Sequence, residues 1–158
     1  MRRHFTSPVI VLAAAVMLSL SAGCDLFKPD VSDASLDDIS IAMPRLEKMR
    51  ADTGRKTVLV DVRSEKNYQA GHLPGALSIP EPTIVADDAR LADAYNIVVY
   101  GRDDFDDLAV VGTKQFLRHN YSHVFLYRAG LEDWRRNGNR IESPAPATQP
   151  QTAPATMP

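Results

Sequence analysis

Residues 57–80 have the sequence TVLVDVRSEKNYQAGHLPGALSIP, and their pattern indicates the fold class of the chain. It begins with a β-branched run at residues 57–62 and continues through a short helical pattern at residues 65–70. A second apolar run, residues 76–79, ends at Pro80. Short, continuously apolar strands separated by a helix are typical of a parallel sheet that is covered on both faces.

The same alternation continues on both sides of this stretch. Further strands are predicted at residues 97–100, just before Gly101, and at residues 123–127. The remaining helices are predicted at residues 44–51, 88–94, 106–118 and 131–136. The pattern therefore predicts an α/β fold with a central parallel sheet of about five strands and helices on both faces.

The two ends of the chain differ from the middle in composition. Basic residues at positions 2–4 precede a charge-free apolar run at 9–20 and small residues at 21–23, the order of a secretory signal. We expect residues 1–23 to be that signal and residues 24–34 a tether, because the polar, acidic stretch to about Asp38 has no sustained apolar period. The folded domain is expected at 35–142 and a disordered Pro/Ala/Thr/Gln tail at 143–158.

The one cysteine of the chain, Cys24, directly follows the small residues of the signal. The string Leu20-Ser21-Ala22-Gly23-Cys24 resembles the lipobox of bacterial lipoproteins, with Ser21 where leucine is usual. The resemblance implies cleavage before Cys24, lipid on that residue and a membrane-anchored protein in the bacterial cell envelope, facing away from the cytoplasm. A plain secretory signal with an incidental cysteine stays open, as does the choice between Sec and twin-arginine export.

Charge and cysteine content exclude several classes of function. Lys plus Arg number 18 and Asp plus Glu number 20, a balance that argues against nucleic acid as the partner. A single cysteine excludes an intramolecular disulfide and Cys-rich zinc or iron–sulfur sites. We expect no cofactor.

The motifs of the central segment and of the last predicted helix resemble those of the rhodanese-like domain. The family's Asp-x-Arg, Gly-His-Ile/Leu-Pro-Gly-Ala and Gly-Gly-x-x-x-Trp patterns are matched by Asp61, Arg63, Gly71, His72, Pro74, Gly75, Gly130 and Trp134. Ala129 stands in place of the first glycine of the last pattern. Each of the matching residues has a structural interpretation. Gly71 and Gly75 supply positive φ around a turn, and His72 is expected to be a hydrogen-bonded turn residue rather than a catalytic one. Arg63 is expected to pair with a nearby acid such as Glu65.

The loop after residue 100 decides whether the domain is an enzyme. In active rhodaneses this position holds a cysteine that carries a persulfide, stabilised by loop amides and a helix N-terminus. Here the position is Gly101, and the segment to Tyr121 is about two residues longer than the common active pattern. The carboxylates of the loop would repel thiosulfate and similar anions. The degenerate loop consists of Gly101, Arg102, Asp103, Asp104, Phe105, Asp106 and Asp107.

The aspartates of this loop allow two interpretations. Their oxygens are ligands of the kind that Ca²⁺ and Mg²⁺ prefer, but their spacing does not match an EF-hand. We favour the other interpretation, in which one aspartate caps the following helix and the others lie near its positive end. No metal site is therefore predicted.

Two functions are compatible with these features of the sequence. The favoured one is a membrane-anchored, catalytically inactive rhodanese-like domain that binds or scaffolds an unidentified protein partner. The alternative is an enzyme, either a sulfurtransferase of the thiosulfate type or a phosphatase-like activity, that uses an unconventional group. Both chemistries on this fold require a thiolate at position 101, which is glycine.

Overall fold

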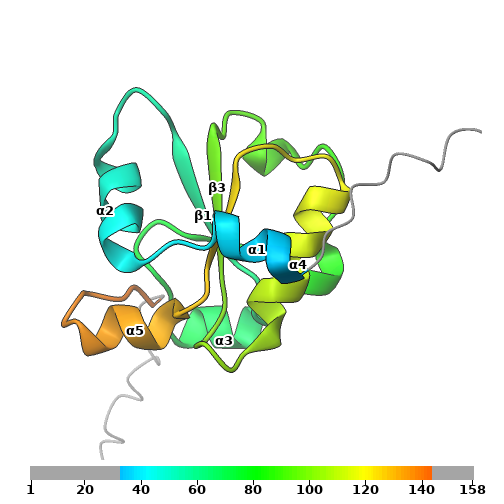
Figure 1. Cartoon of the computed structure of the whole chain (residues 1–158). Helices are drawn as coiled ribbons and strands as arrows, with labels where there is room; N and C mark the ends of the chain where they lie inside the picture. The colour runs from blue at the N-terminus through cyan, green and yellow to red at the C-terminus, as the bar shows by residue number, and fades with distance from the viewer. Residues whose placement is uncertain (1–32, 144–158) are drawn as a thin grey trace, which may run out of the picture. The chain divides into compact units, whose positions relative to one another are not determined.

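The computed structural model describes residues 33–143 (Figure 1). Five α-helices, four strands and two short 3₁₀ helices follow one another within them. In chain order they are α1 (Asp33–Ile39), α2 (Met43–Ala51), β1 (Thr57–Asp61), α3 (Glu65–Ala70), β2 (Leu77–Ser78), η1 (Glu81–Thr83), η2 (Ala89–Leu91), β3 (Asn96–Tyr100), α4 (Asp107–Arg118), β4 (Val124–Tyr127) and α5 (Gly130–Arg136).

The strands form one parallel sheet in the order β2-β1-β3-β4. The predicted α/β class, with helices flanking a parallel sheet, is confirmed. Within the described residues the sheet has four strands rather than about five. A single parallel bridge between Ser40 and Leu126 continues the sheet beyond β4, where a fifth strand would pair.

Alternate side chains of the strands enter two different cores. On one face, Leu59, Val98 and Tyr127 pack with Leu46 of α2 and Trp134 of α5. On the other face, Val60 of β1 and Val99 of β3 pack with residues of the elements that cover the sheet. These are Ile84 at the end of η1, Leu91 of η2 and Phe116 of α4. The continuous apolar runs are thus explained, because a sheet covered on both faces has no polar side.

The structure differs from the sequence prediction at two helices. A helix, α1, occupies Asp33–Ile39, within the polar, acidic stretch to about Asp38 that has no sustained apolar period. Leu36 is fully buried there against Ala109 and Leu126, and Ile39 packs against the same cluster, so these two side chains attach the helix to the domain. At residues 88–94, only the 3₁₀ turn η2 (Ala89–Leu91) forms, capped by the Asp88 carboxylate.

The predicted signal peptide at 1–23 lies outside the described residues. So do the tether up to residue 32 and the tail from residue 144. Within residues 33–143, no helix is long and apolar enough to cross a membrane.

Candidate functional site

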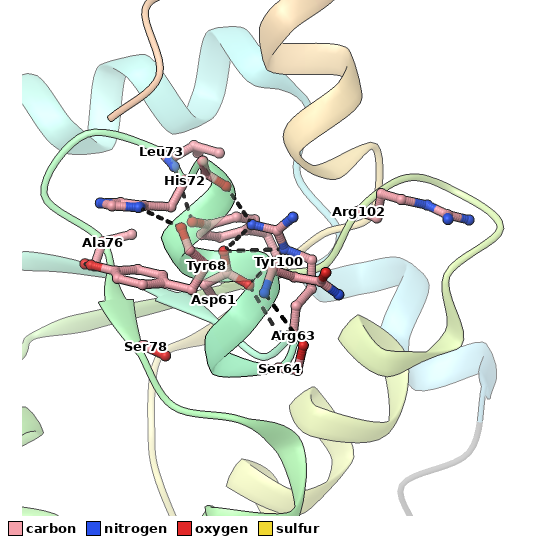
Figure 2. A network of polar contacts seen from close by, with 12 residues as sticks. Asp61, Arg63, Ser64, Tyr68, His72, Leu73, Ala76, Ser78, Tyr100 and Arg102 are labelled. Carbon is pink, nitrogen blue, oxygen red and sulfur yellow. Dashed lines mark hydrogen bonds and ion pairs between the residues drawn. The ribbon is translucent and has the colours of Figure 1, made fainter. Parts of the chain in front are cut away.

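Asp61, Arg63 and His72 of the motifs lie near the ends of β1 and β3, around a buried ion pair (Figure 2). Asp61 is the last residue of β1 and is fully buried, and Arg63 is 6% exposed. The guanidinium of Arg63 donates to both carboxylate oxygens of Asp61, with Nε–Oδ1 at 2.9 Å and Nη2–Oδ2 at 2.6 Å. The Arg63 amide also donates to Asp61 Oδ1. Arg63 thus pairs with a nearby acid, as expected, but that acid is Asp61 and not Glu65, because two parallel bonds to Asp61 hold the guanidinium inside.

A third bond from Arg63 connects the ion pair to the next turn. Its Nη2 donates to the carbonyl oxygen of Gly71 at 2.7 Å. Burial alone would lower the pKa of Arg63, but the hydrogen bonds and negative charge of Asp61 outweigh it, so the pKa is raised above its ordinary value. The guanidinium therefore stays charged, and it fixes the end of β1 against the end of α3.

His72 lies in the turn between α3 and β2 and is 7% exposed. Its ring stacks on Tyr68 with centroids 3.8 Å apart, and its Nδ1 lies 2.9 Å from the Tyr68 carbonyl oxygen. Its backbone pairs in both directions with Glu142. The structure thus places His72 as a packed, hydrogen-bonded turn residue.

The glycines of this turn have the backbone that the sequence predicted. Gly71 has φ 153° and Gly75 has φ 73°, both in the region that favours glycine. Pro74, between them, accepts a hydrogen bond from Arg50 of α2 on its carbonyl oxygen. Together with the pairing of His72 and Glu142, this bond connects the turn to α2 and to the segment after α5.

Tyr100 belongs to the same network, and sequence reasoning missed it. Its side chain is fully buried at the end of β3, and its hydroxyl accepts the amide hydrogen of Leu73 at 3.1 Å. Burial, together with the negative charge of Asp61, raises the pKa of Tyr100 far above its ordinary value. The phenol therefore stays neutral and serves as an anchor for the turn. In the sequence, this role is indicated only by the position of Tyr100 directly before the loop.

The loop that follows β3 is organised by the carboxylate of Asp106. Its Oδ2 accepts the amide hydrogen of Arg102 at 2.9 Å, and its Oδ1 accepts that of Leu108 at 3.1 Å. Asp106 is thereby the N-cap residue of α4. A Cβ atom built on Gly101 would lie 3.1 Å from Asp106 Oδ2. The space beside position 101 therefore already holds a negative charge.

The other loop side chains point to local contacts or to solvent. Asp103 accepts hydrogen bonds from the Phe105 amide and from Arg102 Nε. The Arg102 side chain projects away from the Asp61–Arg63 pair (Figure 2), and Phe105 is 92% exposed. Asp104 is exposed, and Asp107 lies in the first turn of α4. Within residues 33–143, no three His, Cys, Asp or Glu side chains are grouped to hold a metal ion.

The start of α5 closes the loop from the other side. The amides of Leu131 and Glu132 donate to the carbonyl oxygens of Gly101 and Arg102. Gly130 has φ 61°, and a Cβ atom there would lie 2.7 Å from the Gly101 carbonyl oxygen. Glycine is thus required for this close approach of two backbones.

Trp134 anchors α5 in the core. It is 4% exposed, and its indole N–H donates to the carbonyl oxygen of Arg140 at 2.8 Å. Arg50 of α2 lies over its ring, 5.1 Å from the centroid. The side chain therefore connects α5 to α2 and to the chain end that follows it, as expected of a core aromatic residue.

Little open space is left beside the motif residues. A cavity of about 150 Å³ lies between Arg63, Arg102 and the α5 residues Leu131 and Arg135. Ligand sites commonly measure about 300–1,000 Å³, so this one is small. The loop itself, residues 101–107, has no cysteine, serine, threonine or lysine that could act as a nucleophile.

Comparison with known proteins identifies the family. The model of the rhodanese-like domain matches residues 43–137, so the chain belongs to the rhodanese-like domain family. It is 30% identical over 127 residues to a Mycobacterium tuberculosis protein named HTH-type transcriptional regulator Rv0324, covering 73% of this chain. The match spans 56% of that relative, and its name describes that protein alone.

Solved structures agree with this assignment. The BH2092 protein of Bacillus halodurans is 27% identical with a TM-score of 0.56, over 66% of this chain and 74% of that one. The Alr3790 protein of Anabaena sp. is 26% identical with a TM-score of 0.54, over 63% and 79%. A Lactobacillus plantarum protein shares the fold at 17% identity, with a TM-score of 0.60 over 70% and 92%.

Proposed function

We propose that this protein is a membrane-anchored, catalytically inactive rhodanese-like domain that acts as a binding or scaffolding module in the bacterial cell envelope. The observation that carries the proposal is the loop after β3. Position 101 has no side chain, and the Asp106 carboxylate accepts hydrogen bonds from the Arg102 and Leu108 amides.

Both chemistries of this fold require a site that binds an anion. A persulfide, a thiosulfate sulfonate or a phosphate would need the amides that Asp106 already occupies. It would also have to approach a carboxylate, and like charges in contact repel. Loss of the nucleophile and occupation of the anion site thus both disfavour sulfur transfer and phosphatase chemistry at this loop.

The anchor rests on the sequence of residues 20–24. Cys24 follows small residues and an apolar run, as in lipoprotein signals. Lipid at Cys24 would hold the domain on a membrane, facing away from the cytoplasm, and leave the mature chain without a free thiol. The partner that the domain binds there is a protein, in this proposal, and not nucleic acid.

The first experiment measures thiosulfate:cyanide sulfur transfer by the whole chain carrying Cys24→Ser. We expect no turnover above a no-protein control, because no thiolate is left. Clear turnover would overturn the inactive assignment, since an unconventional group would then be doing the chemistry.

A second experiment tests whether the domain is inactive only because position 101 lacks a thiol, or also because Asp106 occupies the anion site. Gly101→Cys is made in the Cys24→Ser background, alone and together with Asp106→Ser. Serine keeps an N-cap oxygen but removes the charge. We expect no sulfur transfer from Gly101→Cys alone, and a thiol pKa lower in the double variant, because a neighbouring carboxylate raises it.

The readout is the rate of reaction with iodoacetamide against pH, with turnover measured in parallel. Equal titration midpoints in the two variants would show that Asp106 does not control the site. Turnover by Gly101→Cys alone would show that only the sulfur is missing. Shortening the loop and replacing its aspartates with glycines and a basic residue should improve on Gly101→Cys.

A further inference from the structure

A second, larger pocket lies at the opposite end of the sheet from the Gly101 loop. It has a volume of about 610 Å³, within the range common for small-molecule sites. Its walls come from α2, from the segment that leads to β1, and from Asn96 and Phe125, which lie on β3 and β4. Figure 1 shows this connection at the top of the view and α3 at the bottom. We refer to this pocket as the α2 groove.

Positive charge dominates the α2 groove although the chain as a whole is slightly acidic. Arg45, Lys48 and Arg55 line it, against one carboxylate, that of Asp52. Asp52 accepts the Gly54 amide hydrogen at 2.9 Å. None of the ion pairs within residues 33–143 involves the three cations.

The two arginines are held by aromatic rings rather than by acids. The guanidinium of Arg45 lies 5.1 Å from the centroid of Phe125, and that of Arg55 lies 5.0 Å from that of Tyr95. Tyr95 in turn stacks on His123. Such contacts restrict a guanidinium without consuming its N–H donors, which remain available for an anion.

The floor of the α2 groove is apolar. Met49 and Phe125 are half-buried there and pack against the core beneath α2. A ligand that contacts this floor would cover apolar surface and at the same time meet the cationic rim. Neither a bare inorganic ion nor an uncharged apolar molecule would use both features.

We propose that the α2 groove binds a small organic anion in which a carboxylate, sulfonate or phosphate is joined to an apolar or aromatic body. The anionic group is held by Arg45, Lys48 and Arg55, and the body lies on Met49 and Phe125. This site uses no residue of the Gly101 loop, so it does not depend on whether the domain is catalytically inactive.

The probe is 8-anilinonaphthalene-1-sulfonate, followed by its fluorescence on titration with the whole chain. N-phenyl-1-naphthylamine, which has the same aromatic body without the sulfonate, is the matched neutral ligand. We expect the sulfonate to bind at least about tenfold more tightly, because charge-assisted hydrogen bonds are stronger than neutral ones. Equal affinities would overturn the proposal.

The protein variants test the position of the site. Arg45→Gln with Arg55→Gln should weaken sulfonate binding by at least about tenfold. Lys66→Gln with Arg118→Gln removes the same charge from α3 and α4, at exposed positions, and should leave binding unchanged. Equal losses in the two double variants would mean that only net charge matters, and no loss in either would place the probe elsewhere. Both results refute the proposal.

Competition identifies the source of the anion. Phenyl phosphate should displace the probe from the whole chain, as expected of a free ligand. Displacement by phosphatidylglycerol vesicles and not by phenyl phosphate would replace the small molecule with a membrane surface, and would overturn the proposal in its present form.

Discussion

Replacing Gly130 with alanine tests how tightly α5 is fitted against the loop after β3. A Cβ atom at this position would lie 2.7 Å from the Gly101 carbonyl oxygen and 2.8 Å from the carbonyl carbon and oxygen of Arg102. All three are backbone atoms, so no flexible side chain can move aside. The helix cannot retreat either, because Leu131 and Trp134 are buried in the core at 5% and 4% exposure.

The cost has two parts. Alanine at φ 61° is strained by about 1 kcal/mol. Separating the two backbones also weakens the hydrogen bonds from Leu131 and Glu132 to the carbonyl oxygens of Gly101 and Arg102, each worth about 1 kcal/mol. We therefore expect the free energy of unfolding to fall by about 3 kcal/mol, which for a domain of this size lowers Tm by about 12 °C.

Gly75→Ala is the matched control. Gly75 has a similar positive φ of 73°, but a Cβ atom there has nothing within 4 Å. It therefore carries the conformational strain alone, about 1 kcal/mol. Alanine lowers the entropy of the unfolded chain in both variants, and this offsets the loss of stability by the same amount in each.

The measurement is urea denaturation followed by circular dichroism, with thermal melts as a second readout. The contrast between the two variants is the test. If they differ by less than about 0.5 kcal/mol, near the precision of such comparisons, the close approach of α5 to the loop is not what requires glycine.

Three further predictions concern the anchor, the chain end and alkaline pH. Cys24→Ser should abolish lipid labelling and release the protein from membranes on fractionation; labelling that persists would place the lipid elsewhere. Deleting residues 144–158 should leave Tm nearly unchanged, whereas deletion from residue 141 removes the bridge of Glu142 to His72 and should lower Tm clearly in the same melt. Burial and the hydrogen bond to Asp133 raise the pKa of Tyr127, so its contribution to stability is full below about pH 10 and is lost as the pH rises above that. The stability difference between wild type and Tyr127→Phe should therefore fall by about 1.4 kcal/mol per pH unit above about pH 10. A difference that stays constant with pH would show that Tyr127 does not ionise on unfolding.

The sequence predicted the strands to within one or two residues at each end. Their apolar runs stand out because the sheet is buried on both faces, so few polar residues, such as Asp61 and Ser78, lie within them. Helix α4 was predicted equally well, since Asp106 provides an N-cap signal directly before it. These features are local, and local patterns are what a single sequence displays.

The features that the sequence could not predict depend on the path of the chain in three dimensions. Helix α1 is attached through Leu36, whose neighbours Ala109 and Leu126 lie far along the chain. Too few apolar residues surround Leu36 to give a helical period. Likewise, the pairing of Arg63 with Asp61 rather than Glu65 depends on how the chain turns after β1, which alternation in the sequence does not specify.

The role of Asp106 bears on whether the domain could regain persulfide chemistry. In our proposal its carboxylate does two things, since it caps α4 and it occupies the loop amides. Restoring a cysteine at position 101 leaves the charge in place beside the new sulfur. Removing the charge by Asp106→Ala frees the amides, but takes away an N-cap worth about 1 kcal/mol. Each change alone therefore leaves either an occupied site or a weakened helix, and the two must come together with a residue such as serine that caps without charge.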